Sequence, residues 1–249
     1  MSNLPKITAD FSPISLDDMD DVKLMSRTDT KFAFKLVKLP VLLQKMMPFY
    51  RILEIDGELI HDYKSLYFDT DDRKFYLDHH NRRVNRNKIR FREYIGSSLT
   101  FLEVKHKNNK GKTIKKRIKV DSVSESLTSK QHDFIEKVIG SRLDVHAKQW
   151  INFSRITFVH KKQKERLTID IDLTYNDSDK KGDLKQIVIA EVKQERMSRT
   201  SDFMRIAKEL HVLPIRISKY CMSTLELNPH LKQNRFKEKV LFLTKLKQA

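Results

Sequence analysis

Cysteine, glycine and proline are scarce in this sequence. Cys221 is the single cysteine, which excludes an internal disulfide and cysteine-rich zinc patterns and favours a reducing compartment such as the cytoplasm. Five glycines and six prolines in 249 residues exclude the collagen-like and low-complexity classes. No uncharged apolar run approaches the ~20 residues that a membrane helix needs, and the first ten residues lack the basic and apolar regions of a signal peptide. These absences predict a soluble, cytoplasmic globular protein with one domain over residues 1–249.

Positive charge, by contrast, is abundant. The sequence has 50 Lys and Arg against 33 Asp and Glu, a formal net charge of +17 at pH 7. A field of that sign attracts nucleic acids, anionic lipids and phosphorylated molecules. The composition therefore predicts a polyanionic partner. Aromatic residues do not interleave with the basic positions, as stacking on single-stranded nucleic acid requires, so no specific nucleic acid is expected.

The stretch from Asn87 to Val120 carries much of this charge in a regular pattern. Three runs, 88–92, 101–107 and 114–120, alternate between charged and mostly apolar residues. Because side chains on a strand alternate with period two, adjacent strands here would form one basic surface that contains a single carboxylate, Glu103. Such a surface is either ordinary solvated sheet or a site that binds something strongly anionic.

Similar alternation recurs along the chain and predicts about eight strands with helices between them. Further strands are predicted at 26–34, 152–160, 166–173 and 187–195, and Asp56-Gly57 predicts a hairpin that joins strands 52–55 and 60–69. In the run 166–173, one predicted face is Leu167, Ile169, Ile171 and Leu173, and the other is Arg166, Thr168, Asp170 and Asp172. The predicted helices are 15–25, 37–47, 71–80, 124–139, 201–211, a helix from Lys219 onward, and a basic amphipathic helix at 234–247.

The charged faces mix Asp or Glu with Lys and Arg, and they recur around most of the predicted sheet. An ordinary half-buried sheet has one such face in water. A closed antiparallel barrel with a polar lumen, and with helices packed on its apolar outer face, would give the same pattern in every strand. We therefore predict an α+β fold built on a closed, basic-lined barrel. The helix at 234–247 would either pack against this barrel or contact an anionic membrane.

An ordered series of motifs resembles a known family. The motifs are Arg27-x-Asp29-x-Lys31, Tyr67-Phe68-Asp69-Thr70, Lys88-x-Arg90-x-Arg92, Glu103-x-Lys105, Glu191-x-Lys193 and Ser218-Lys219-Tyr220. The series is similar to the VTC domain, the polyphosphate polymerase module of the vacuolar transporter chaperone, within the triphosphate tunnel metalloenzyme (CYTH-like) superfamily. The resemblance covers roughly residues 26–222, which would form the core of the domain.

The resemblance implies an antiparallel tunnel in which basic residues bind phosphates and an acidic residue holds Mn²⁺ or Mg²⁺. It assigns Lys31, Arg90, Arg92 and Lys219 as catalytic residues, Glu191 and Glu103 as metal-ligand candidates, and as phosphate-binding residues Lys88, Lys105, Lys115, Arg117, Arg155, Arg166, Lys193 and Ser218. Many tunnel enzymes carry a glutamate-rich first motif where this sequence has Arg27 and Asp29, so a metal role is not expected of that strand. Tyr67 and Phe153 are predicted to be packing residues.

Two enzymatic functions and one binding function remain open. The first transfers the γ-phosphate of ATP onto a growing polyphosphate chain, which needs no strong general base because the attacking phosphate is already anionic. The second hydrolyses a triphosphate, for which Glu103 or Asp170 could help to activate water. The third is noncatalytic binding of polyphosphate or RNA. Glu103 could instead neutralise neighbouring lysines, and Asp170 and Asp172 could form a structural network with Arg166. The resemblance also suggests a membrane-bound transporter partner, with the protein at the inner face of the membrane.

Overall fold

The structure is a computed structural model that describes residues 4–22, 28–110, 113–195, 198 and 200–248. The strands are β1 Pro13–Ile14, β2 Thr28–Lys35, β3 Tyr50–Leu53, β4 His61–Asp69, β5 Arg86–Tyr94, β6 Leu99–Lys107, β7 Thr113–Val120, β8 His146–His160, β9 Glu165–Asn176, β10 Lys181–Asp183 and β11 Ile187–Gln194. The α-helices are α1 Leu4–Ala9, α2 Leu39–Met46, α3 Lys74–His80, α4 Ser129–Ile139, α5 Asp202–Glu209, α6 Lys219–Leu227 and α7 Lys237–Gln248, and the 3₁₀ helices are η1 Asp17–Val22, η2 Leu36–Lys38 and η3 Asn234–Phe236.

Eight strands form one antiparallel path in the order β2-β11-β9-β8-β4-β5-β6-β7. The short strands lie beside this path: β3 pairs with β8 and, in parallel, with β1, and β10 pairs with β9. The predicted α+β class with a large antiparallel sheet is confirmed. Between the residues that the structure describes, no hydrogen bonds join the end strands β2 and β7. The sheet is therefore open there, and closure into a barrel is not confirmed.

Two groups of helices cover the apolar face of the sheet, as the alternation predicts. On one half, α1, α2 and α5 pack on β2, β8, β9 and β11, with Leu42 and Phe203 buried among Phe34, Phe158 and other strand residues. On the other half, Phe75 of α3 and Ile135 of α4 are buried against β4, β5 and β6. Burying these large apolar side chains removes hydrocarbon from water and stabilises the sheet.

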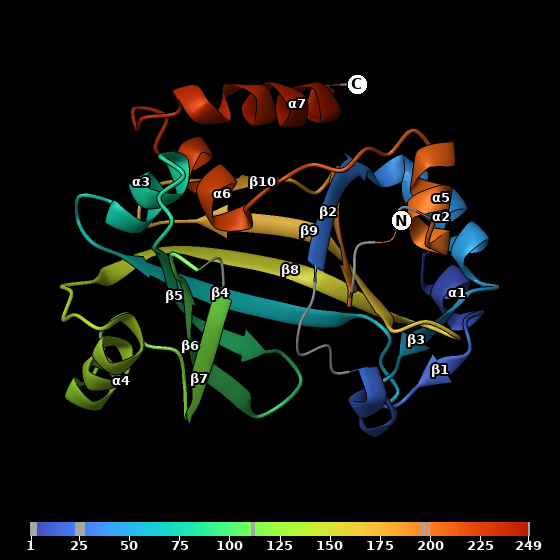
Figure 1. The fold of residues 1–249 in the computed structure, drawn as a ribbon, viewed down its shortest axis with the longest axis horizontal. Helices are drawn as coiled ribbons and strands as arrows, with labels where there is room; N and C mark the ends of the chain where they lie inside the picture. The colour runs from blue at the N-terminus through green and yellow to red at the C-terminus, as the bar shows by residue number, and fades with distance from the viewer. Residues whose placement is uncertain (1–3, 23–27, 111–112, 196–197, 199, 249) are drawn as a thin grey trace.

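The helices α6 and α7 depart from the prediction that all helices pack outside. Tyr220 and Leu225 of α6 and Leu243 of α7 are buried in one cluster with Ala33 and Ile189. Ile189 has the same strand parity as Glu191, so these helices cover part of the charged face of the sheet. They lie with α3 on one side of the sheet in Figure 1. The face that was expected to be a hollow lumen is therefore partly closed by α6.

The alternation of β9 breaks near its end. Arg166, Thr168 and Asp170 share one face as predicted, but Asp172 has φ 52° and the register between β8 and β9 shifts nearby, between Asn152 and Ser154. The irregularity rotates the following residue, so that Leu173 joins the α6 cluster instead of the outer core that contains Ile171. The predicted single apolar face through Leu173 is wrong for this reason.

The turn at Asp56-Gly57 forms, but the predicted hairpin does not. Both residues have positive φ (53° and 81°), and Ile55 and Glu58 exchange backbone hydrogen bonds around them. The strands on either side then diverge, because β3 and β4 each pair with a different part of the long strand β8. The predicted turn therefore forms, but the strands on either side of it pair with β8 and not with each other.

Most predicted helices are present with shifted ends. Helix α4 begins at Ser129, where Thr128 caps it with a capping box, and Gly140 ends it with φ 87°. Of the predicted helix 15–25, residues 17–22 form η1 and residues 23–25 lie outside the described residues. None of the described helices is both long and apolar enough to cross a bilayer.

Candidate functional site

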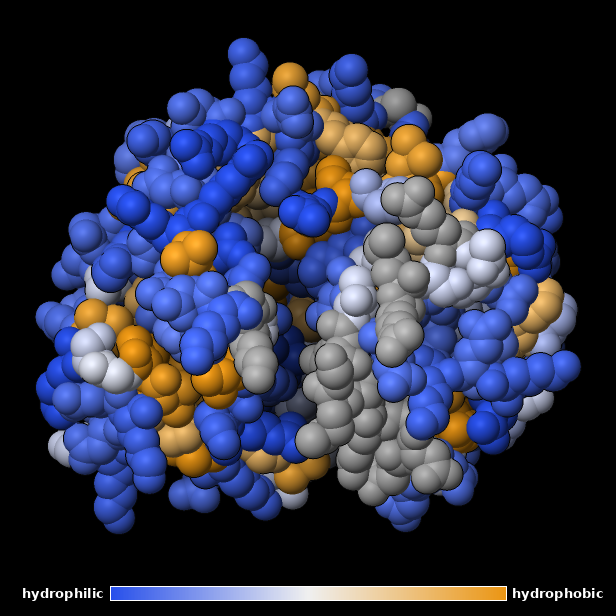
Figure 2. All heavy atoms as spheres, viewed as in Figure 1, coloured by the Kyte–Doolittle hydropathy of each residue, from blue (hydrophilic) through white to orange (hydrophobic). Residues whose placement is uncertain are grey.

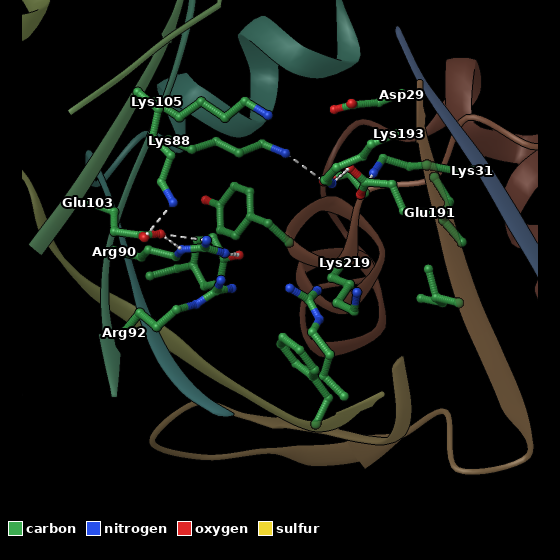
Figure 3. Close-up of a pocket in the computed structure, with 18 of the residues that line it drawn as sticks. Asp29, Lys31, Lys88, Arg90, Arg92, Glu103, Lys105, Glu191, Lys193 and Lys219 are labelled. Carbon is green, nitrogen blue, oxygen red and sulfur yellow. Dashed lines mark hydrogen bonds and ion pairs between the residues drawn. The ribbon is translucent and has the colours of Figure 1, made fainter. Parts of the chain in front are cut away.

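The charged face of the sheet surrounds a cavity of about 280 Å³, which we call the central cavity. The surface in Figure 2 is mostly hydrophilic and is hollowed near its middle, and Figure 3 shows the charged side chains pointing towards one another from opposite walls. The predicted site residues that line the cavity are Lys31, Lys88, Arg90, Arg92, Glu103, Lys105, Lys115, Arg155, Arg166, Glu191, Lys193, Ser218 and Lys219.

One predicted phosphate-binding residue does not belong to this lining. Arg117 lies over the ring of Phe101, 4.3 Å from its centroid, and does not line the cavity. Arg27 lies outside the described residues. Tyr67 and Phe153, predicted to pack, do line the cavity. Period-two counting could have placed both in it, since Phe153 and Arg155 share parity and Tyr67 pairs with Arg90 across the strands.

Strand register explains why these charges meet. Lys88 of β5 lies opposite Lys105 of β6, and Lys105 lies opposite Lys115 of β7. Across the cavity, Glu191 of β11 lies opposite Lys31 of β2. Directly paired residues on antiparallel strands point to the same face. The sheet thus concentrates like charges that would repel unless a counterion or an anionic ligand is present.

Glu103 serves as counterion to two cations. Its Oε2 accepts hydrogen bonds from Arg90 Nε (2.9 Å) and Nη2 (2.6 Å), and its Oε1 lies 2.6 Å from Lys115 Nζ. Burial alone would raise the pKa of Glu103, but Arg90, Arg92 and Lys115 outweigh burial and hold that pKa well below its usual range. Glu103 is therefore an ionised partner for these cations and a weak base.

Asp170 plays the same part on the opposite wall. Its carboxylate is 3% exposed and accepts hydrogen bonds from Arg155 Nε (2.6 Å) and Nη2 (2.8 Å), and it also pairs with Lys219. These cations hold its pKa well below the usual range against the opposing effect of burial. Asp170 therefore takes part in a network of ion pairs, as one alternative predicted, and its partners in these hydrogen bonds are Arg155 and Lys219.

Glu191 lies between two lysines. Its Oε2 pairs with Lys31 and its Oε1 with Lys193. Burial opposes the charge on Glu191, but Lys31 and Lys193 lower its pKa well below the ordinary value. Asp29, on the strand next to Glu191, lines the same cavity and is the cross-strand neighbour of Lys193. Asp29 and Glu191 are therefore diagonal neighbours on adjacent strands.

Three cations in the central cavity have no carboxylate partner in the part of the chain that the structure describes. Among the described residues, no ion pair joins Lys88, Arg92 or Lys105 to an acid, although Lys88 donates to Ser218 Oγ at 2.9 Å. Arg92 is 6% exposed, and burial together with Arg90 lowers its pKa to about 10. Buried charges without partners are costly. An anionic ligand in this cavity would supply the missing negative charge.

Tyr67 adds a polar group to the same wall. Its hydroxyl oxygen accepts a hydrogen bond from Arg90 Nη1 at 2.7 Å, and its ring stacks on Tyr220 with 5.1 Å between centroids. Burial would raise the pKa of Tyr67, but Arg90, Arg92 and Lys88 lower it more. Since the oxygen accepts from Arg90, the hydroxyl hydrogen is available to a ligand in the cavity.

The carboxylates in the cavity fit a magnesium or manganese ion that is bound together with a phosphate ligand. In the part of the chain that the structure describes, no group of three His, Cys, Asp or Glu side chains could hold a metal alone. Mg²⁺ is commonly held by one or two carboxylates plus substrate phosphates, and carboxylate oxygen also suits Mn²⁺. Glu191 with Asp29 provides such a pair on neighbouring strands, whereas the residues directly opposite Glu103 are the cations Arg90 and Arg117. The oxygens of both glutamates pair with cations, those of Glu191 with Lys31 and Lys193 and those of Glu103 with Arg90 and Lys115.

When an anion binds in the central cavity just above pH 8, the protein is expected to take up a proton. Burial and the neighbouring Lys88 lower the pKa of Lys105 to about 8; Lys31 acts in the same direction, whereas Glu191 and Asp29 oppose it. A bound anion favours the charged lysine and so raises this pKa again. Between the two pKa values, Lys105 gains a proton as the anion binds.

Titration calorimetry with tripolyphosphate, in buffers of different ionisation enthalpy, measures this uptake. The Lys105→Met variant is the control. It should bind tripolyphosphate more weakly and take up fewer protons than the wild type, keeping only the share of Lys193, whose pKa burial also lowers to about 8. Equal proton uptake in both proteins would show that Lys105 is not the group that titrates.

Comparisons with known proteins bear on this site. The model of the VTC domain family matches residues 26–228. A comparison with curated proteins finds no match. Among solved structures, PH1819 from Pyrococcus horikoshii OT3 matches with a TM-score of 0.46 and 12% identity, covering 82% of this chain and 99% of that one. HpAC1 from Hippeastrum, a proposed adenylyl cyclase described as having a dominant triphosphatase activity, matches with a TM-score of 0.47 and 14% identity, covering 80% and 97%.

Proposed function

Because this chain belongs to the VTC domain family, we propose that it is a metal-dependent polyphosphate polymerase that transfers the γ-phosphate of ATP to a polyphosphate chain. The observation that carries the proposal is the central cavity with Lys88, Arg92 and Lys105, three inward cations that lack a carboxylate partner among the described residues. Phosphate oxygens accept charge-assisted hydrogen bonds strongly from such groups.

The proposed roles follow from the arrangement of charges. Lys88, Arg92 and Lys105 bind the phosphates, and Lys31 and Lys219 act with Arg90 at the reacting phosphoryl group, all from within the cavity. Phosphoryl transfer proceeds through a loose transition state, so catalysis rests on positioning and on electrostatic stabilisation. Glu191 and Asp29 would hold Mn²⁺ or Mg²⁺, which supplies neutralisation of charge on the phosphate oxygens.

The state of the carboxylates supports transfer over hydrolysis. Hydrolysis requires a group that activates water, and Glu103 and Asp170 were the candidates. Each is held by two cations that lower its pKa well below the usual range. A weak base that is already hydrogen-bonded activates water poorly. A terminal phosphate needs no such activation, because it carries its own negative charge.

Product analysis tests this proposal. Purified protein incubated with ATP and Mn²⁺ is expected to form ADP and chains of phosphate, which are resolved by gel electrophoresis and by ³¹P NMR. Orthophosphate without chains would select the hydrolase instead. Absence of both products would contradict any enzymatic function of this cavity.

The domain organisation, the location and the partner of the protein complete the proposal. We propose that residues 1–249 act as one domain, since Leu243 of α7 is buried with Tyr220 of α6. A cytoplasmic location near the inner face of a membrane, and a transporter that receives the product, remain predictions from the family resemblance.

A further inference from the structure

A second cavity, of about 610 Å³, adjoins the central one. The two share Lys31 and Ile217 in their linings. The second cavity is formed by the end of α3 and the loop after it, the beginning of β5, the end of β6, the residue before Ile217, and the segment η3–α7. The helices α3, α6 and α7 lie together on one side of the sheet in Figure 1. The cavity therefore continues the charged interior towards that side.

The charged residues of known placement that line the second cavity are all cations. It includes Arg82, Arg83, Arg86, Arg216, Arg235 and Lys239, and no Asp or Glu lines it among the described residues. In the same part of the chain, no ion pair joins any of these six side chains to a carboxylate. The central cavity, by contrast, contains Asp29, Glu103 and Glu191. The second cavity thus lacks the internal counterions of the first.

Two neighbouring groups show the effect of this charge. Burial, together with Lys88 and Arg86, lowers the pKa of His79 to about 3, so this imidazole is neutral at pH 7. Its Nδ1 is buried and has no hydrogen-bond partner among the described residues. Burial also lowers the pKa of Lys239, and Arg82 and Arg216 act in the same direction. A neutral histidine, and a lysine whose charged form is disfavoured, are expected where positive charge has no counterion.

The aromatic groups argue against bases as the ligand. Among the described residues that line this cavity, Phe236 is the one Phe, Tyr or Trp residue, and its side chain is buried at 4% exposure. It packs edge-on against His80 and Tyr76, and Lys239 Nζ lies 5.2 Å from its centroid. Recognition of single-stranded nucleic acid depends on open aromatic faces. A ligand with charge but no bases fits this cavity better.

We propose that the second cavity binds the part of a linear polyphosphate chain that extends beyond the central cavity. Lys31 lies at the junction and contributes to both linings, so one anionic chain can follow the cations from one cavity into the next. The identity of the chain rests on the proposed function. The consequence is that affinity depends on chain length: a triphosphate fills the central cavity alone, whereas a longer chain also contacts Arg83 and Arg216.

The double variant Arg83→Ala/Arg216→Ala tests this inference without turnover. Both side chains are exposed, so their removal leaves the core intact. Affinities for tripolyphosphate and for a longer linear polyphosphate are measured by calorimetry at one fixed salt concentration, without ATP. The wild type should bind the longer chain more tightly. The variant should lose about tenfold or more of its affinity for the longer chain, since charge-assisted hydrogen bonds are removed, and keep its affinity for tripolyphosphate within about twofold.

The matched control is Lys130→Ala/Lys137→Ala, which removes two exposed cations of α4 that line neither cavity. It should bind both ligands as the wild type does. Equal affinity of the wild type for both chain lengths, or an equal loss for both ligands in the double variant, would overturn the second site. Failure of the wild type to bind tripolyphosphate would instead contradict the proposed function of the central cavity.

Discussion

The Glu191→Gln variant is expected to lose turnover while it keeps its affinity for polyphosphate. Glutamine preserves the volume of the side chain and removes the negative charge that Lys31 and Lys193 share. Turnover should fall by about a hundredfold or more, because a proposed metal ligand and a fixed charge near the reacting phosphate are both lost. Metal-free binding of tripolyphosphate should be unchanged or tighter, since the cavity becomes more positive.

Comparison with Glu103→Gln separates the two metal-ligand candidates. Glu103 neutralises Arg90 and Lys115, so its replacement should lower stability and leave the metal concentration needed for activity unchanged. Glu191→Gln should raise that concentration. Glu54→Gln, which changes an exposed glutamate outside both cavities, is the control for loss of one charge. Full activity of Glu191→Gln at the same metal concentration would show that the metal assignment is wrong.

Replacing Arg92 and Arg155 by methionine should affect stability differently, with a loss only for Arg155→Met. Both guanidinium groups lie over the rings of Tyr63 and Phe153, between 5.2 and 5.8 Å from the centroids. The two changes therefore remove similar cation–π contacts. They differ in that Arg155 binds Asp170 through two hydrogen bonds, whereas Arg92 has no carboxylate partner among the described residues.

Arg155→Met should lower the free energy of unfolding by about 3–5 kcal/mol, because a buried carboxylate loses a partner. Arg92→Met should leave the free energy of unfolding unchanged or raise it, because burial of an unpaired cation is costly. It should also weaken tripolyphosphate binding by about tenfold or more. Urea denaturation and calorimetry measure both quantities. If Arg92→Met is the more destabilised variant, then Arg92 has a structural role and is not held ready for a ligand.

Alternation in the sequence predicts which strand residues share the charged face, and the family resemblance adds the residues that no strand pattern indicates, such as Ser218 and Lys219. Lys88, Arg90 and Arg92, and likewise Glu191 and Lys193, lie two residues apart on single strands, and a regular strand places such residues on one face whatever its partners are. The lining of the central cavity follows from that rule and from the family resemblance. Arg117 failed to join it because its side chain lies over Phe101, a contact that no spacing reveals.

Closure of the sheet and the position of α6 could not be predicted in the same way. Alternation shows which side chains share a face, but it contains no information on whether the end strands β2 and β7 meet. The charged face also has to be covered at one end, and Tyr220 and Leu225 do this by packing on Ala33 and Ile189. The apolar pattern of α6 alone does not show which face of the sheet it will cover.

The second cavity could not be predicted from the sequence, because its residues show no periodic pattern. Arg82 and Arg83 follow the end of α3, Arg216 precedes α6, and Arg235 and Lys239 come from the last segment of the chain. In the sequence these appear as separate basic positions in loops and in a terminal helix.

A crystal structure of the protein with tripolyphosphate tests the central claim most directly. We expect the phosphate chain inside the central cavity, with its oxygens in contact with Lys88, Arg92 and Lys105, for which the described residues provide no carboxylate partner. The ion pairs of Glu103 with Arg90 and of Asp170 with Arg155 should remain intact. Tripolyphosphate bound only on the outer surface, with the central cavity free of it, would contradict the claim that this cavity is the phosphate-binding site.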